Sequence, residues 1–188
     1  MFQIRIHGRG GQGVVTATEL LSIAAFMEGA HAQAFPSFGS ERTGAPVVAF
    51  CRIDDKEIRL REPIVEPDAL IVQDATLFKV IDVFHGLKPK GYLLVNTNKS
   101  FEELHIADRV AKIPPGHAHA TNATAIALKH IGRPLPNAVL LGAFAALTGV
   151  VHLKSVAEAI RQQFSGKIGE ANVAAATEAY EATEPVAV

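Results

Sequence analysis

The chain has 188 residues, of which 48% are hydrophobic and 20% charged, and this balance excludes a disordered polar chain. Eighteen Lys and Arg are matched by nineteen Asp and Glu, so the net charge of −1 leaves no positive excess to hold a phosphate backbone, and nucleic acid is not an expected partner. The length predicts one domain over residues 1–188 that buries its core without disulfides or a structural metal.

Cysteine content and apolar stretches narrow the chemistry and the compartment. The single Cys51 cannot form an internal disulfide, and an iron–sulfur cluster needs about four thiolates, so no cluster is expected on this chain. Cys51 lies in an apolar run and is predicted to be a buried, inert thiol. The longest apolar stretch, 138–151, is shorter than the roughly 20 residues of a membrane span, and no signal-peptide pattern opens the chain. We therefore expect a cytoplasmic protein without a membrane segment.

The first part of the chain predicts a strand, a turn and a helix. Apolar and polar residues alternate over 2–7, which indicates a strand, and a helix-compatible run over 14–27 follows a glycine-rich segment. A second strand is expected over 31–35. These elements would form a β-loop-α-β unit.

The rest of the chain continues the alternation of strands and helices. The expected elements are a loop over 36–46, hairpin strands over 47–53 and 57–60, buried strands over 69–72 and 91–95, and a helix over 75–84. Beyond residues 114–116 the sequence predicts helices over 119–131, 137–148, 153–164 and 169–182. The pattern predicts an α/β fold, a single Rossmann-like open sheet with flanking helices and a helical C-terminal part.

The glycine-rich segment after the first strand is a candidate ligand loop. It reads Gly8-Arg9-Gly10-Gly11-Gln12-Gly13. The G-x-G-x-x-G spacing between a strand and a helix permits a tight turn and places free N–H groups at the helix N-terminus, where they favour an anion, and Arg9 is a further candidate contact. A dinucleotide site also needs a carboxylate about 20 residues further on. Positions 33–35 hold Gln, Ala and Phe instead, so glycines that serve only to pack against a neighbouring chain stay an open alternative.

A second candidate loop combines glycines, prolines and charge. It contains Ser37-Phe38-Gly39-Ser40-Glu41-Arg42-Thr43-Gly44 and continues to Ala45 and Pro46. Arg42 is suited to bind a carboxylate or phosphate with its planar guanidinium, and Ser37 and Thr43 are suited to add hydrogen bonds. A solvated Glu41–Arg42 ion pair is the structural alternative. We favour binding, because charged residues on rigid loops are where ligand contacts concentrate.

The histidines predict no metal site and no catalytic triad. His117 and His119 would point about 200° apart on the expected helix and could not share an ion. No Ser-His-Asp arrangement stands out, so no catalytic residue is assigned. Alanines at 171, 174, 175 and 179 suit close helix contact and a subunit interface.

Three segments in order resemble one family. The glycine-rich segment continued by Val14-Val15-Thr16-Ala17 supplies the first likeness, the loop from Phe38 to Val47 the second, and Asn137-Ala138-Val139-Leu140-Leu141-Gly142-Ala143 the third. Together they resemble the landmarks of the gamma subunits of 2-oxoacid:ferredoxin (or other acceptor) oxidoreductases, pyruvate type.

The resemblance implies a non-autonomous subunit. The assembled enzyme would convert a 2-oxoacid and coenzyme A to an acyl-CoA, carbon dioxide and two electrons for ferredoxin or another acceptor. Thiamine diphosphate, Mg and 4Fe-4S clusters would be held by partner subunits of alpha, beta and delta type, and none by this chain alone. The chain itself would contact coenzyme A through its two loops. The residues expected there are Gly8, Arg9, Gly10, Gly11, Gln12, Gly13, Ser37, Phe38, Gly39, Glu41, Arg42, Thr43 and Gly44.

Three alternatives stay open at this point. The same kind of complex could act on an aromatic or branched 2-oxoacid, such as phenylglyoxylate or indolepyruvate. The chain could instead be a stand-alone dinucleotide-binding protein, or a scaffold without ligand contacts.

Overall fold

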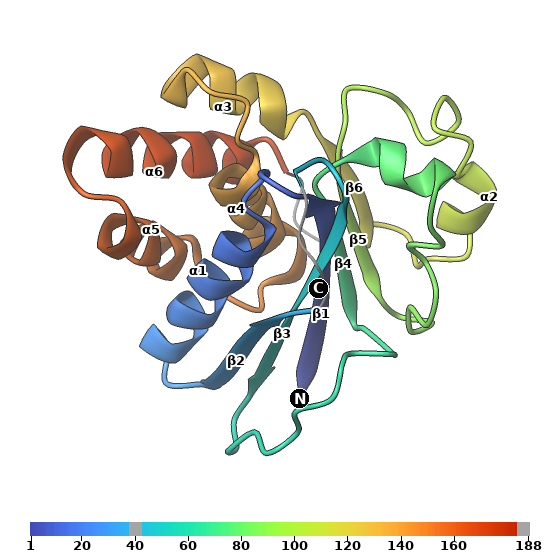
Figure 1. The fold of residues 1–188 in the computed structure, drawn as a ribbon, viewed down its shortest axis with the longest axis horizontal. Helices are drawn as coiled ribbons and strands as arrows, with labels where there is room; N and C mark the ends of the chain where they lie inside the picture. The colour runs from blue at the N-terminus through green and yellow to red at the C-terminus, as the bar shows by residue number, and fades with distance from the viewer. Residues whose placement is uncertain (38–42, 184–188) are drawn as a thin grey trace.

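A mixed sheet forms the centre of the molecule. The computed structural model describes residues 1–37 and 43–183, and within them the sheet has six strands in the order β2-β3-β1-β4-β5-β6 (Figure 1). The strands are β1 (Phe2–Arg9), β2 (His31–Pro36), β3 (Pro46–Asp54), β4 (Ala69–Val72), β5 (Tyr92–Asn96) and β6 (Ala118–Thr121). β3 runs antiparallel to β1 and β2, whereas β1, β4, β5 and β6 are successive parallel neighbours. The predicted Rossmann-like α/β sheet is confirmed.

Helices cover the two faces of the sheet unequally. The elements are α1 (Val14–Met27), a 3-10 helix (Ala75–Lys79), α2 (Ala107–Val110), α3 (Ala123–Ile131), α4 (Asn137–Thr148), α5 (Leu153–Gln163) and α6 (Gly166–Glu181). In Figure 1 the long helices gather on one side of the sheet, and α2 lies on the other. The helical C-terminal part is therefore the second layer of the same core.

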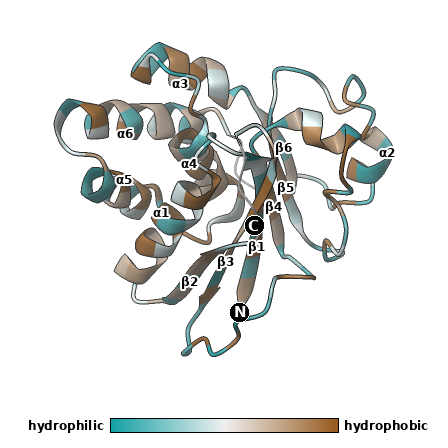
Figure 2. Ribbon diagram, in the orientation of Figure 1, coloured by the Kyte–Doolittle hydropathy of each residue, from teal (hydrophilic) through white to brown (hydrophobic). Residues whose placement is uncertain are grey.

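The central helix α4 carries most of this packing. Nearly every residue of α4 is buried, as its continuous apolar sequence predicts. The outer helices α3, α5 and α6 show hydrophilic and hydrophobic colours side by side in Figure 2, as helices with one solvent-facing side do. No helix in the described part of the chain is both long and apolar enough to cross a bilayer.

The expected hairpin after β3 is wrong. Residues 57–60 form no strand, because both edges of β3 are already paired, with β1 on one side and β2 on the other. The chain that follows this segment returns to β3 at Glu62. There the carbonyl of Glu62 accepts a hydrogen bond from Nη2 of Arg52, at 2.5 Å. Arg52 is 1% exposed, so this loop closes over a buried cation.

Two expected helices are also shorter than predicted. The run over 75–84 forms only the 3-10 helix, and beyond it the carbonyls of Val83 and His85 accept hydrogen bonds from Arg5 on β1. The predicted helix over 119–131 begins at Ala123, because residues up to Thr121 form the edge strand β6. In both places a tertiary hydrogen bond or a strand partner competes with local helix propensity and wins.

Candidate functional site

The glycine-rich segment lies at the carboxyl edge of the sheet. β1, β4, β5 and β6 are parallel, so their carboxyl ends share one edge, which is where open α/β sheets bind ligands. Gly11 and Gly13 have φ of 91° and 72°, in the left-handed region that favours glycine. Gly13 caps α1 without a side-chain hydrogen bond, and the first turn of α1 has no acidic residue. The first N–H groups of α1 are therefore available to an anion.

Two glycines of the segment are required by close packing. A Cβ atom on Gly8 would lie 2.5 Å from Cγ2 of Val14, and one on Gly13 would lie 2.6 Å from Nδ2 of Asn137. These close contacts are made by other elements of this same chain, so packing of the glycines against a neighbouring chain stays an open alternative.

The structure brings the two predicted loops together. The N–H of Gly10 donates to the carbonyl of Ala45 at 2.9 Å, and the N–H of Gly44 donates to the carbonyl of Gly10 at 3.1 Å. Thr43 forms an isolated parallel bridge with Gly10, and Ser37 extends the pairing at the end of β2. The remaining predicted residues of this loop lie outside the described residues: Phe38, Gly39, Glu41 and Arg42.

Arg9 ties three segments together. Its Nε donates to Oδ2 of Asp74 at 3.1 Å, its Nη1 to the carbonyl of Gly44 at 2.9 Å, and its Nη2 to Oγ1 of Thr76 at 2.9 Å. Gln12 also donates to Oδ2 of Asp74, at 3.1 Å, and its Oε1 accepts from the N–H of Arg9. Each guanidinium nitrogen thus has a protein acceptor, and Arg9 first of all positions the two loops.

Asp74 is the residue that sequence reasoning missed. Burial acts to raise the pKa of Asp74, but hydrogen bonds from Thr76 and Gln12 and the charge of Arg9 outweigh it and lower the pKa. The side chain is therefore an ionised acceptor at neutral pH. The sequence did contain a signal for Asp74. The residue follows a buried strand at the carboxyl edge of the parallel sheet, and an Asp at this place two residues before Thr76 suits the N-cap of a helix.

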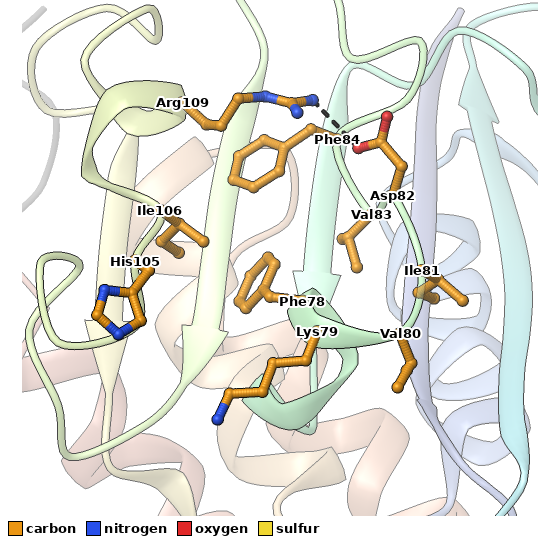
Figure 3. A pocket seen from close by; sticks show the side chains of 10 residues that line it. All are labelled: Phe78, Lys79, Val80, Ile81, Asp82, Val83, Phe84, His105, Ile106 and Arg109. Atoms are coloured by element: carbon orange, nitrogen blue, oxygen red, sulfur yellow. Dashed lines mark hydrogen bonds and ion pairs between the residues drawn. The ribbon is translucent and has the colours of Figure 1, made fainter.

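Cavities lie next to this region and away from it. A cavity of about 560 Å³ reaches Gly11 and Gly13. A second, of about 370 Å³, lies on the opposite face around the 3-10 helix and α2 (Figure 3) and contains none of the predicted residues. Its main groups contact one another, since Arg109 stacks over Phe84 and pairs with Asp82 at 3.1 Å. Of the residues predicted to bind a ligand, only Gly11 and Gly13 line the 560 Å³ cavity.

The comparison with known proteins decides the family. The family described as "Pyruvate ferredoxin/flavodoxin oxidoreductase" matches residues 3–182. The chain belongs to this family. The family resemblance of the three sequence segments is thereby confirmed.

Relatives match this family member from end to end. It is 51% identical to "Pyruvate/ketoisovalerate oxidoreductases common subunit gamma" of Pyrococcus furiosus, covering 98% of both chains. It is 50% identical to "Pyruvate synthase subunit PorC" of Methanothermobacter marburgensis, covering 96% of this chain and 97% of the relative. The crystal structure of pyruvate oxidoreductase subunit PORC from Thermotoga maritima superposes with a TM-score of 0.79 at 38% identity, covering 96% of this chain and 95% of the other.

Cys51 and the histidine pair can now be placed in the family member. Cys51 is buried, as predicted, and burial raises the pKa of its thiol to about 12, so the thiol stays protonated at neutral pH. The helical geometry assumed for His117 and His119 is wrong, because His119 lies in β6 and His117 directly precedes it. The His117 ring stacks on Tyr92 with centroids 4.1 Å apart. Among the described residues, no three His, Cys, Asp or Glu side chains come together as a metal site.

A buried histidine precedes the glycine loop. Nε2 of His7 accepts a hydrogen bond from Nε of Arg5 at 3.0 Å, and Nδ1 of His7 is buried without a hydrogen-bond partner in the described part of the chain. Burial and the neighbouring charge of Arg5 lower the pKa of His7 to about 3. His7 is therefore neutral in the folded chain at physiological pH.

We expect His7 to make the fold sensitive to acid. An unfolded His titrates near 6.5, so between pH 6.5 and 3 the unfolded chain binds the extra proton and stability falls as pH falls. The His7 contribution to the unfolding free energy should drop by about 2–3 kcal/mol from pH 7 to pH 4.5. Urea unfolding at both pH values measures it, and H7F should reduce the difference. The exposed His31 supplies the control, H31Q; equal pH dependence in H7F and the wild type would contradict the assignment.

Proposed function

We propose that the chain is the gamma subunit of a 2-oxoacid:acceptor oxidoreductase complex that prefers pyruvate, and that it has no activity alone. The observation that carries the proposal is the end-to-end match to a relative named as a gamma subunit, with 98% of both chains covered. A protein named as one subunit of an oxidoreductase works together with other subunits, and we infer the same need of companion chains for this chain. Those companions are expected to be of alpha, beta and delta type.

The proposed division of labour places the redox groups on the partners. The only cysteine of this chain is Cys51, buried and with a raised pKa, and an iron–sulfur cluster takes about four thiolates. The residues present do not fit a cluster. Thiamine diphosphate, Mg and the 4Fe-4S clusters are accordingly assigned to partner subunits, with ferredoxin or another acceptor reached through the complex.

Selection of the 2-oxoacid is assigned to the partners as well. The Pyrococcus furiosus relative is named as a subunit common to pyruvate and ketoisovalerate oxidoreductases. A subunit shared in this way cannot be what separates the two substrates. Whether a complex with this chain takes pyruvate, a branched or an aromatic 2-oxoacid is therefore set by its companions.

The chain's own contribution is a part of the coenzyme A pocket and of the subunit interface. The glycine loop leads into an N-terminus of α1 that no side chain caps, and it meets the second loop at the carboxyl edge of the sheet, which suits a phosphate-bearing ligand. Because the Arg9 guanidinium is bound to Asp74, Gly44 and Thr76, we assign it the positioning of the loops. Arg42 and the first N–H groups of α1 are assigned the contacts with the coenzyme, because the N–H groups of Gly10 and Gly44 already donate within the chain.

The stand-alone dinucleotide-binding alternative fits the topology less well. In a dinucleotide site the strand beside β1 ends in a carboxylate that is free to bind the ribose. Here one neighbour of β1 is the antiparallel β3, and the other, β4, leads to Asp74, whose oxygens are taken by Arg9, Gln12 and Thr76. Among the described residues, no carboxylate at this position is left without a partner.

Reconstitution tests the proposal. The purified chain should neither oxidise pyruvate nor bind thiamine diphosphate, whereas the assembled complex should do both. Within the complex, R42A should raise KM for coenzyme A about tenfold, as loss of a charge-assisted hydrogen bond to a phosphate does, with little change in KM for pyruvate. R61A, at an exposed arginine, is the matched control. Turnover by the chain alone would refute the subunit role, and an unchanged KM for coenzyme A would favour a scaffold.

A further inference from the structure

The 560 Å³ cavity lies beside the starts of three helices, α1, α4 and α6. Its walls come from the glycine loop and the start of α1, the segment before α4, and the start of α6. The lining residues are Gly11, Gly13, Thr16, Ile131, Arg133, Leu135, Asn137, Phe164, Ile168 and Asn172. α1 is capped by Gly13 and α4 by Pro136; neither cap accepts a hydrogen bond with a side chain, and neither first turn contains an acidic residue. Two positive helix ends therefore converge without an anion from either first turn.

A buried amide lines this cavity. Asn137, the first residue of α4, is 7% exposed, and its side chain forms no hydrogen bond with any residue that the structure describes. It lies against Gly13, where an added Cβ would come within 2.6 Å of its Nδ2. A polar side chain in a protein interior is normally hydrogen-bonded. The amide therefore lacks an acceptor that a ligand in the cavity would supply.

The remaining walls define the kind of ligand. Arg133 is exposed, and within residues 1–37 and 43–183 it forms no ion pair and no Asp or Glu lines the cavity. The body of the cavity is apolar, formed by Ile131, Leu135, Phe164 and Ile168. Its volume is in the range of pockets that enclose small organic molecules. The cavity thus has hydrogen-bond donors and positive charge at one end and an apolar wall at the other. This arrangement matches a ligand with an anionic group and an apolar body.

We propose that this cavity binds an organic phosphate or carboxylate with an apolar body. The anionic group lies at the first turns of α1 and α4, accepts a hydrogen bond from Nδ2 of Asn137 and pairs with Arg133. The hydrocarbon part contacts the apolar wall. The anion belongs either to coenzyme A, in which case the inference deepens and rests on the proposed function, or to a separate small metabolite.

Calorimetric titration of the full chain with hexyl phosphate tests the site. We expect saturable binding to one site, at least about tenfold tighter than inorganic phosphate or hexanol, because each of these lacks one half of the match. N137D should weaken binding at least about tenfold by charge repulsion, while an acidic residue in the first turn of α4 favours the helix and preserves the fold. R133Q should weaken binding about threefold or more, and R61Q, which removes the same charge elsewhere, should not.

Two results would overturn the proposal: no saturable binding of hexyl phosphate, or equal affinity in N137D and the wild type with both chains folded by circular dichroism. A competition arm identifies the source of the anion. Displacement of hexyl phosphate by coenzyme A supports the site with the coenzyme as its ligand. If coenzyme A does not displace hexyl phosphate, the site is supported with a separate metabolite as its ligand. If the chain then also fails to bind coenzyme A, that result contradicts the proposed coenzyme A contact and leaves the cavity site standing.

Discussion

Replacing Gly142 by alanine should destabilise the protein by about 2–3 kcal/mol, although alanine favours a helix over glycine by about 1 kcal/mol. The cause is the crossing of α4 and α6. A Cβ atom on Gly142 would lie 1.9 Å from the carbonyl oxygen of Ala176 and 2.6 Å from its carbonyl carbon. These are backbone atoms of a packed helix and cannot rotate away, so the helices must separate. Urea unfolding of the purified chain at neutral pH measures the loss.

Helix propensity alone predicts that G142A stabilises the protein, so a loss of stability identifies the clash with α6 as its cause. A146G, in the half-buried part of the same helix, is the reverse exchange and should cost only about 1 kcal/mol through helix propensity. If G142A proved as stable as the wild type, the close approach of α4 and α6 would be refuted. Because α4 begins with Asn137 beside Gly13, a separation of these helices should also weaken ligand binding at the glycine loop.

Replacing Asp74 by asparagine should loosen both loops, with a stability loss of about 1–3 kcal/mol and a marked rise in KM for coenzyme A in the complex. The carboxylate accepts from Arg9, Gln12 and Thr76 at once, and the amide of asparagine cannot accept from all of them or balance the charge. Since the pKa of Asp74 is lowered, its contribution is present above the ordinary Asp pKa and is lost as pH falls below it.

A closely matched pair supplies the control for Asp74. Asp82 pairs with Arg109 at 3.1 Å, the same distance as Asp74 and Arg9, but both partners are exposed, so D82N should cost less than about 1 kcal/mol. A double-mutant cycle of R9M and D74N should show coupling, because each residue binds the other. Additive effects of R9M and D74N, or equal losses in D74N and D82N, would contradict the positioning role of the Asp74–Arg9 pair.

Local patterns predicted the elements whose determinants are local. The apolar runs that become β4 and β5 and the continuous apolar sequence of α4 were placed close to their observed bounds. The strand–glycine–helix order predicted the turn that joins β1 to α1. These features depend on periodicity, backbone permissiveness and burial, which a sequence carries directly.

The errors arose where distant residues compete for the same backbone. The expected partner of β3 was its sequence neighbour over 57–60, but β1 and β2 occupy both of its edges. The run over 75–84 favours a helix locally, yet Arg5 on β1 binds the carbonyls of Val83 and His85. Strand order also separated β2 from β1, which a β-loop-α-β pattern does not reveal. The spacing of residues along the sequence does not show which of several distant segments will pair with a given strand or carbonyl group.

For this protein, the sequence by itself determined the α/β class, the family landmarks, the isolated cysteine and the positions where only glycine can turn. Only the tertiary structure decided that Arg9 is held by Asp74, that the two loops meet at Gly10 and Gly44, and that the starts of α1 and α4 share one cavity with Asn137. The physical reason is range. Turn conformation and hydrophobic periodicity act between near neighbours, whereas ion pairing and shared helix ends join residues that only the completed sheet and its helical layer bring together.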